Sequence, residues 1–178
     1  MPHAHLLTKI FPTAWGYVGL AATEHGLVRI ALPRKSKKQV ERGLRGVLRG
    51  WPNADVETPS VARVFEILDE AERQVGDYLA GRRRTFDLPL AVPKATDFMR
   101  SVWRACSEIP YGKTRSYQWI AKRIGRPKAS RAVGAALGAN PLPLAVPCHR
   151  VMRSDGSLGG FGGGLPLKQR LLALESQK

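Results

Sequence analysis

Cysteine is scarce in this chain, whose 178 residues include only Cys106 and Cys148. Two thiols are too few for a disulfide framework, they lack the spacing of a zinc site, and His3, His5 and His25 have no cysteine near them, so we expect no metal. No apolar run approaches the roughly 20 residues that span a bilayer, and the start of the chain lacks the regions of a secretory signal. The sequence therefore predicts a globular, cytoplasmic protein that is not held in a membrane.

Acidic residues are also few, because 14 Asp and Glu stand against 29 Lys and Arg, which gives a net charge of +15. Residues 1–92 contain 14 basic and 10 acidic side chains, whereas residues 93–178 contain 15 and 4. Such an excess attracts nucleic acid through counterion release, although a solvated basic surface without a ligand has the same composition. We expect the second half of the chain to face a polyanion.

The first 92 residues have the pattern of an α/β scaffold domain without a catalytic cluster. Alternating apolar residues at 15–32 break at Gly26, which predicts a β-hairpin with this glycine in the turn. A capping box opens a helix over residues 36–50, and a longer helix follows over residues 60–81. The apolar stripe of the longer helix consists of Val61, Val64, Phe65, Leu68, Ala71, Val75 and Leu79.

Residues 93–178 form the second domain, which we predict to be mostly helical. Thr96 is a good N-cap for a helix that ends before the Pro and Gly turn at 109–112. A short capped helix at 116–125 and a second helix opening at Pro127 follow. In a basic region this pair indicates a helix-turn-helix, although an ordinary helical hairpin has the same pattern.

The second helix of this pair has an almost bare outer face. Val133, Leu137 and Asn140 share its packing side, whereas the other side is mainly alanine and glycine. Such a face lacks the side chains that read the major groove, and it is narrow enough to enter a widened minor groove. Arg131 on this face either fills the space of a base pushed out of the stack or contacts a phosphate. The candidate DNA contacts are Ser116, Lys128, Arg131, Ala132, Ala135 and Gly138.

A candidate nucleophile lies in the segment Pro147-Cys148-His149-Arg150-Val151. A neighbouring imidazole and positive charge lower the cost of forming a thiolate at Cys148, although a lone cysteine is more often a small buried hydrophobe. Glu175 lies beside the apolar stripe of the last helix, predicted over residues 166–175. A partly buried carboxylate needs a partner, for which His149 is the candidate, and a solvated glutamate is the alternative. Between them, residues 156–164 contain six glycines and resemble a mobile loop.

Together these residues resemble a known family, the O6-alkylguanine-DNA alkyltransferases, also called methylated-DNA–protein-cysteine methyltransferases. The likeness extends from about Thr96 to Glu175. It rests on the ordered motifs Ser116-Tyr117-Gln118, Pro127-Lys128-Ala129, Arg131-Ala132-Val133-Gly134, Gly138-Ala139-Asn140-Pro141, Pro147-Cys148-His149-Arg150-Val151 and Leu171-Leu172-Ala173-Leu174-Glu175. It implies a ribonuclease-H-like α/β N-terminal domain, supported only by the order of elements, and a mostly α, winged-helix-like C-terminal domain with a helix-turn-helix.

The resemblance implies DNA repair by direct reversal, in which Cys148 takes the alkyl group from O6-alkylguanine and keeps it as a thioether, so that each chain acts once. It implies that His149 is a base acting through a water and that Glu175 orients His149. Asn140 matches a residue that organises the active-site turn. Tyr117 matches a phenol that donates a proton towards the departing guanine.

The resemblance also implies a substrate, a pocket and a partner. Arg131 matches the arginine that fills the gap left by the flipped nucleotide. Many members have a Tyr-Ser pair where this chain has Phe161-Gly162, so a hydroxyl contact is missing and the alkyl range, including O4-alkylthymine, stays open. We expect double-stranded DNA containing O6-alkylguanine as the partner, no cofactor, and a monomer or cooperative clusters on DNA in the nucleoid. The implied pocket residues are Pro143, Val151, Phe161, Gly162 and Gly163.

Three other functions compete with this one. Alkyltransferase-like lesion sensors share the fold but lack the reactive cysteine, so Cys148 argues against them. A helix-turn-helix regulator reads base edges, which the bare outer face does not support. A cysteine hydrolase with Cys148, His149 and Glu175 turns over without DNA, but adjacent Cys and His are unlike the usual distant pairing.

Overall fold

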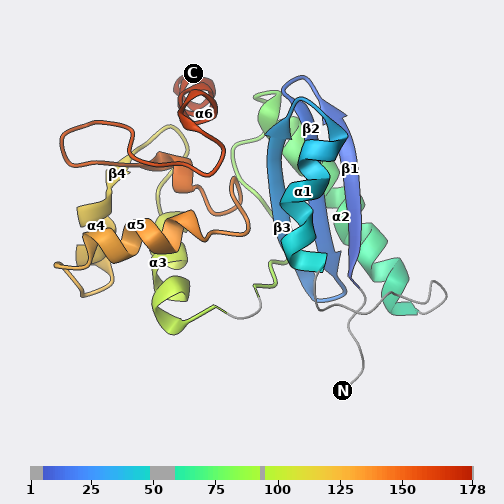
Figure 1. Ribbon diagram of the computed structural model, residues 1–178, viewed down its shortest axis with the longest axis horizontal. Coiled ribbons are helices and arrows are strands. Elements are labelled where there is room, and N and C mark those ends of the chain that lie inside the picture. The colour runs from blue at the N-terminus through green and yellow to red at the C-terminus, as the bar shows by residue number, and fades with distance from the viewer. Residues whose placement is uncertain (1–5, 49–58, 93–94, 178) are drawn as a thin grey trace. The chain divides into compact units, whose positions relative to one another are not determined.

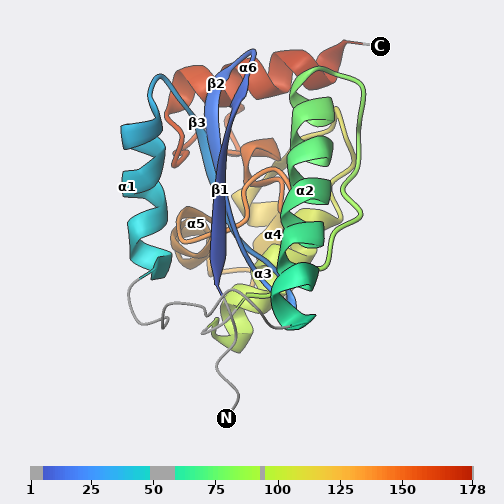
Figure 2. The same cartoon turned by 90° about the vertical axis from the view of Figure 1, so that its right-hand side faces the viewer.

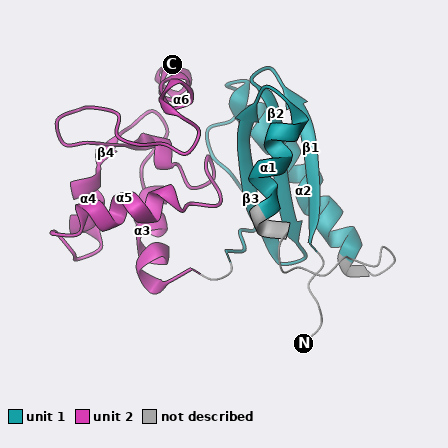
Figure 3. Cartoon of the chain, in the orientation of Figure 1, with its two compact units in different colours: residues 1–93 teal, residues 94–178 magenta. Residues whose placement is uncertain are grey.

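The structure is a computed structural model that describes residues 6–48, 59–92 and 95–177. The chain separates into two units, residues 1–93 and 94–178, which Figure 3 colours differently. The first unit contains a sheet with helices, and the second is mainly helical, as the sequence predicts.

An antiparallel sheet in the order β1-β2-β3 forms the first unit, with β1 (Leu7–Thr13), β2 (Gly16–Thr23) and β3 (Gly26–Arg34) (Figure 1). The predicted hairpin of β2 and β3 is confirmed. Gly26 has a φ of 143°, and a Cβ there would lie 2.5 Å from the carbonyl oxygen of Pro89, so the turn requires glycine. The sequence analysis missed β1, which pairs with β2 along its whole length, because Lys9 and Pro12 break its apolar alternation as edge strands allow.

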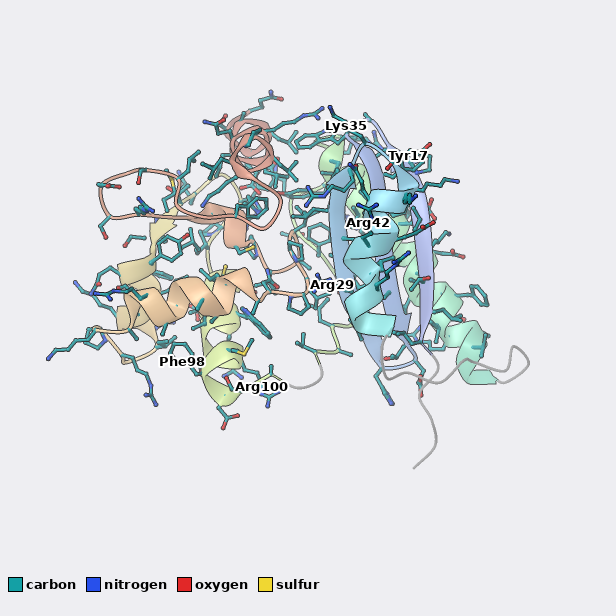
Figure 4. The ribbon with its side chains drawn as sticks, in the orientation of Figure 1. Tyr17, Arg29, Lys35, Arg42, Phe98 and Arg100 are labelled. Atoms are coloured by element: carbon teal, nitrogen blue, oxygen red, sulfur yellow. The ribbon has the colours of Figure 1, made fainter. Side chains whose placement is uncertain are left out.

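The sheet lies between α1 (Lys37–Leu48) and α2 (Pro59–Leu79), as Figure 2 shows. Val40 and Leu44 of α1 belong to one buried cluster with residues of the sheet, whereas Arg42, labelled in Figure 4, is on the exposed side of α1. The expected helix stop at Gly50 lies outside the described residues. The predicted stripe of α2 is buried, with one exception.

Phe65 is the exception, because it is 50% exposed. The buried positions 61, 64, 68, 71 and 75 alternate steps of three and four residues. Phe65 comes one residue after Val64, a member of this series, and one residue on an α-helix turns the side chain by about 100°. The prediction that Phe65 belongs to the core is therefore wrong.

The second unit packs α3 (Asp97–Ser107), α4 (Tyr117–Arg123) and α5 (Ser130–Gly138) against one another. The two predicted N-caps are confirmed, because Thr96 Oγ1 accepts from the Met99 N–H at 3.2 Å and Ser116 Oγ accepts from the Trp119 N–H at 3.0 Å. The buried indole of Trp103 donates to the carbonyl oxygen of Ala136 at 2.9 Å, which ties α3 to α5. The helix-turn-helix therefore consists of α4 and α5, which both pack against α3.

The second helix of this motif begins at Ser130, so the prediction that it opens at Pro127 is wrong. The Ala129 N–H donates to the carbonyl oxygen of Arg126 at 2.9 Å, which makes residues 126–129 a turn with proline at its second position, where the fixed φ of proline is favoured. Gln118 of α4 holds this turn, because its Nε2 donates to the Pro127 oxygen at 2.8 Å and its Oε1 accepts from Ser130 Oγ at 2.6 Å.

The rest of the second unit carries the motif around Cys148. A 3₁₀ turn, η1 (Cys148–Arg150), leads into β5 (Val151–Met152), which pairs in parallel with β4 (Arg115–Ser116). After a glycine-rich loop, α6 (Leu165–Ser176) ends the described chain and contacts η1. In the part of the chain that the structure describes, every helix is too short or too polar to cross a membrane.

Candidate active site

Cys148 is held at the start of η1 by the side chain of Asn140, which follows α5. Asn140 Nδ2 lies 3.3 Å from Cys148 Sγ and donates to the carbonyl oxygen of Val146 at 2.9 Å, while its Oδ1 accepts from the Leu142 N–H at 2.9 Å. The Asn140 amide thus fixes the segment between α5 and η1 at Leu142 and at Val146, and it directs an N–H towards the sulfur. The sequence analysis selected both Asn140 and Cys148, and the structure brings them together.

The segment that Asn140 fixes contains a strained residue. Leu144 has a φ of 78°, a left-handed conformation that costs a non-glycine residue on the order of 1–3 kcal/mol and is found mostly where the surroundings enforce it. The Val146 N–H donates to the Leu142 oxygen at 2.8 Å, and Pro143 is buried beside this tight turn. This turn lies between the end of α5 and η1, so it helps to set the position of Cys148.

The expected pairing of His149 with Glu175 is present, with 2.8 Å between Nε2 and Oε1 and exposures of 0% and 4%. Glu175 also accepts from Arg150 through Nε at 2.9 Å and Nη2 at 2.9 Å, and from the Gly112 N–H at 3.0 Å. Arg150 Nη1 donates to the Ile109 oxygen at 2.7 Å. Arg150, whose charge was expected to favour the Cys148 thiolate, is instead the counter-charge of the buried Glu175 carboxylate.

Burial sets the protonation of the two adjacent site residues. It lowers the pKa of His149, against the opposing effect of the hydrogen bond that His149 donates to Glu175, so this imidazole is neutral at neutral pH. Burial also raises the pKa of the Cys148 thiol, and the Asn140 hydrogen bond and the charge of Lys168 oppose this rise without cancelling it. Desolvation therefore outweighs the contacts that favour the thiolate, so the Cys-His neighbourhood alone does not make this thiol acidic.

Lys168 of α6 is a further site residue that the sequence analysis missed. It is fully buried, and its Nζ donates to the Val151 oxygen at 2.5 Å and to the Leu158 oxygen. Burial lowers its pKa to about 8, and the proximity of the Cys148 and Cys106 thiols opposes this fall. The available signal was its spacing, because Lys168, Leu171 and Glu175 share one face of α6 at i, i+3 and i+7.

Replacing Lys168 by Met is expected to slow the reaction of Cys148 with iodoacetamide and to move its pH profile to higher pH. The ammonium group lowers the thiol pKa, so its removal makes the thiolate rarer. Because Lys168 loses its proton near pH 8, the parent and the variant should differ most below that pH and converge above it. Lys113→Met, at an exposed lysine of the same unit, is the control, and an unshifted profile for Lys168→Met would contradict the expectation.

Cys148 opens on a cavity of about 290 Å³. Its lining consists of Tyr117, Gly134, Leu137, Gly138, Cys148, Gly160, Phe161 and Gly162. Among the expected pocket residues, Phe161 and Gly162 therefore line the cavity, whereas Pro143, Val151 and Gly163 do not. Four of the lining residues are glycines, so the cavity has room for a flat group next to the sulfur.

Tyr117 is held in the cavity wall by the glycine-rich loop. Its hydroxyl is 3.5 Å from the Gly160 oxygen, and a Cβ at Gly159, whose φ is 66°, would lie 2.7 Å from that hydroxyl. Burial raises the pKa of Tyr117, so the phenol keeps its proton at neutral pH. The loop and the phenol therefore form one packed wall that carries a proton donor.

The outer face of α5 is exposed as the sequence predicts, and its inner residues Val133 and Leu137 are buried. Ser116 is half-buried and caps α4. Within residues 6–48, 59–92 and 95–177, no group of three or more His, Cys, Asp or Glu side chains is arranged to hold a metal ion. The exposed residues of the expected DNA-contacting set are Lys128, Arg131, Ala132, Ala135 and Gly138.

Two domain families match the chain. The ribonuclease-like domain of 6-O-methylguanine DNA methyltransferase matches residues 6–92, and the DNA-binding domain of the same name matches residues 97–177. A methylated-DNA–protein-cysteine methyltransferase from Methanosarcina acetivorans is 45% identical over 166 residues, which are 93% of this chain and 96% of the relative. One of the same name from Mycolicibacterium paratuberculosis is 54% identical over 105 residues, which are 59% of this chain and 63% of that protein.

Solved structures agree with these relatives. The crystal structure of the Mycobacterium tuberculosis O6-methylguanine methyltransferase is 35% identical, with a TM-score of 0.72 and coverage of 96% of this chain and 93% of that one. The structure of the Mycobacterium tuberculosis protein OGT in complex with DNA is 34% identical, with a TM-score of 0.74 and coverage of 95% and 92%.

Proposed function

The chain belongs to the 6-O-methylguanine DNA methyltransferase family and repairs DNA by alkyl transfer, and from this premise we propose that Cys148 takes the alkyl group from O6-alkylguanine in double-stranded DNA. One observation carries the proposal. The sulfur of Cys148 lines a cavity of about 290 Å³ and receives an N–H from Asn140, while the next residue, His149, is paired with buried Glu175.

The proposed reaction is a single displacement at the alkyl carbon. His149, neutral and with Nε2–H directed at Glu175, takes the thiol proton at its other ring nitrogen through a water. The Cys148 thiolate attacks the carbon, so the S–C bond forms, the C–O6 bond breaks, and the electron pair stays with guanine. The Tyr117 phenol donates a proton towards the departing base. A thioether has no good leaving group, so each chain acts once.

The raised thiol pKa gives the supporting residues their roles. Since the Cys148 thiol is mostly protonated at neutral pH, a base has to act during the reaction, and a neutral imidazole can do so. Asn140 Nδ2 then stabilises the developing thiolate. Glu175 orients His149, and Arg150 supplies the counter-charge of that buried carboxylate.

The direct test is the intact mass of the protein after mixing with a duplex that carries one O6-methylguanine. We expect the mass to rise by one methyl group, to saturate at one per chain, and to map to the peptide with Cys148. Tight binding to the lesion without a change in mass would instead assign the chain to the non-repairing lesion sensors.

Arg131→Ala is expected to weaken extrusion of the target base more than binding to an undamaged duplex. The exposed Arg131 side chain on the bare face of α5 is proposed to occupy the space that the base leaves. A fluorescent base analogue at the lesion position measures extrusion, and a binding titration measures affinity. Lys128→Ala is the control, because a plain phosphate contact should change both readouts together. Equal losses for Arg131→Ala would reduce Arg131 to such a contact.

The remaining proposals concern range, assembly and place of action. Phe161 and Gly162 leave the cavity without a side-chain hydroxyl at the expected Tyr-Ser position, so the range of alkyl groups stays open, and we propose O4-alkylthymine as the further substrate to test. We propose that the chain acts as a monomer, alone or in cooperative clusters, on nucleoid DNA in the cytoplasm. The proposed domains are residues 1–92 and 93–178.

A further inference from the structure

Helix α1 of the first unit carries a row of basic side chains on its outer side. Lys38, Arg42 and Arg45 follow one another at steps of four and three residues, so they share one face of the helix. The buried residues Val40 and Leu44 come two residues after Lys38 and Arg42, about 200° further around the helix. The three basic side chains, named the α1 row below, are therefore exposed on the side of α1 that faces away from the sheet (Figure 4 labels Arg42).

The charges of the α1 row are not neutralised within the part of the chain that the structure describes. None of its three side chains forms an ion pair with a described carboxylate. Glu41 is the only acid in residues 34–45, which also contain the basic residues Arg34, Lys35 and Lys37. Six basic side chains thus stand against one acidic side chain in this stretch.

Helix α2, on the other side of the sheet (Figure 2), has the opposite arrangement. Its 21 residues include five acids and two basic residues. Four cations at α2 lie within 2.9 Å of a carboxylate, in the pairs Arg63–Glu66, Arg73–Glu70, Arg82–Asp77 and Lys9–Asp69. The acids of the first unit are thus concentrated at α2 and paired there, whereas the unpaired positive charge is concentrated at α1.

The surroundings of the α1 row favour a nucleic acid as its partner. The exposed neighbours Ser36, Gln39 and Glu41 are polar, and the described apolar side chains of α1, Val40 and Leu44, are buried. A helix that lies on a membrane inserts an apolar face, and a protein interface is centred on apolar or aromatic anchors, so α1 suits neither.

A second copy of this chain is also a poor fit, because the carboxylates that it would offer at α2 are already paired. A DNA duplex instead offers a regular row of phosphates about 3.4 Å apart along the axis on each strand. The α1 row covers seven residue steps of a helix, or about 10 Å, and so spans about three phosphates of one strand.

We propose that the α1 row is a second DNA-contacting surface, which binds the phosphate backbone of duplex DNA without sequence preference and separately from α5. Lysine and arginine side chains on phosphates release condensed counterions, which favours binding to any sequence. Such a contact helps to keep the chain on undamaged DNA, where a lesion has to be found. The proposal concerns the binding of DNA, so it does not rest on the role of Cys148.

The test removes the three charges of the α1 row together, in Lys38→Gln/Arg42→Gln/Arg45→Gln. The affinity of the full chain for an undamaged duplex is measured over a range of salt concentrations. The matched control, Arg63→Gln/Arg73→Gln/Arg82→Gln, removes the same number of charges from the same unit, at exposed side chains that are paired with carboxylates. Circular dichroism checks that both variants keep their fold.

The variant of the α1 row is expected to bind the duplex more weakly than the parent at low salt and to depend less on salt. The slope of log affinity against log salt should become shallower by about 0.9 for each lost phosphate contact, up to about 2.7 for the three side chains. In the control variant, the slope should change by less than the effect of one contact, about 0.9.

Two results would overturn the proposal. One is a slope change in the α1 row variant that is no larger than in the control, which would mean that the row acts only through the net charge of the chain. The other is unchanged binding to DNA together with lost binding to vesicles of phosphatidylserine, which would assign the row to a membrane surface. Failure of the parent to take a methyl group from O6-methylguanine would instead reject the proposed function and leave the slope comparison unaffected, so the two failures are distinguishable.

Discussion

Cys148→Ala is expected to abolish alkyl transfer completely while the chain still binds a duplex containing O6-methylguanine. The substitution removes the only described thiol that lines the cavity, and alanine leaves the Asn140, His149 and Glu175 side chains in place. No other group there can form the carbon–sulfur bond. Intact mass after mixing with the lesion duplex measures transfer, and a binding titration with the same duplex measures recognition.

Cys106→Ala is the matched control for this loss. Cys106 lies in α3, is fully buried, and has a thiol pKa raised by burial, so it is neither accessible nor ionised at neutral pH. We expect this variant to gain one methyl group per chain as the parent does. A methylated Cys148→Ala chain, or an unmodified Cys106→Ala chain with intact fold, would show that Cys148 is not the acceptor.

Local signals in the sequence predicted the elements that local interactions form. Gly26 marked the hairpin because its backbone conformation excludes a side chain, and Thr96 and Ser116 marked helix starts because their hydroxyls accept from N–H groups three residues on. Pro127 misled the prediction because proline suits both the first turn of a helix and the second position of a β-turn. The contacts of Gln118 with the following turn decide between the two.

The site residues also fall into two groups, those that a sequence motif indicates and those whose roles depend on contacts made in the folded unit. Motif residues such as Cys148, Asn140 and Glu175 could be selected from the sequence, and the structure brings them together. The spacing on α6 places Lys168 on the same face as Glu175, but the roles of Arg150 and Lys168 depend on contacts with Glu175 and Val151, which are 25 and 17 positions away. The raised thiol pKa likewise follows from burial in the folded unit rather than from the Cys-His neighbourhood.

Glu175→Gln is expected to lower the free energy of unfolding by about 3–5 kcal/mol, the usual cost of removing one partner from a buried ion pair. The carboxylate accepts from N–H donors at both oxygens, Oε1 from His149 and Arg150, and Oε2 from Arg150 and Gly112. A glutamine amide replaces one oxygen with an NH₂ group that faces these donors, and it leaves the Arg150 guanidinium without a counter-charge. Urea unfolding measures the loss.

Glu108→Gln provides the matched comparison, because Glu108 accepts from Arg123 at 2.7 Å but its side chain is 40% exposed. Its loss should cost less than about 1 kcal/mol, as for other exposed pairs. A similar small cost at Glu175 would contradict the importance of its burial.

The Glu175 substitution also shows whether Glu175 contributes to the rate of alkyl transfer separately from its contribution to the free energy of unfolding. In Glu175→Gln, the single-turnover rate of alkyl transfer should fall while affinity for DNA is nearly unchanged, because His149 loses the acceptor that orients it, whereas the exposed face of α5 is untouched. In the double variant Arg150→Met/Glu175→Gln, both buried charges are gone, so stability should partly recover. The rate should stay low, because no carboxylate holds His149. A rate equal to that of the parent in either variant would remove Glu175 from the mechanism and leave it a structural counter-charge for Arg150.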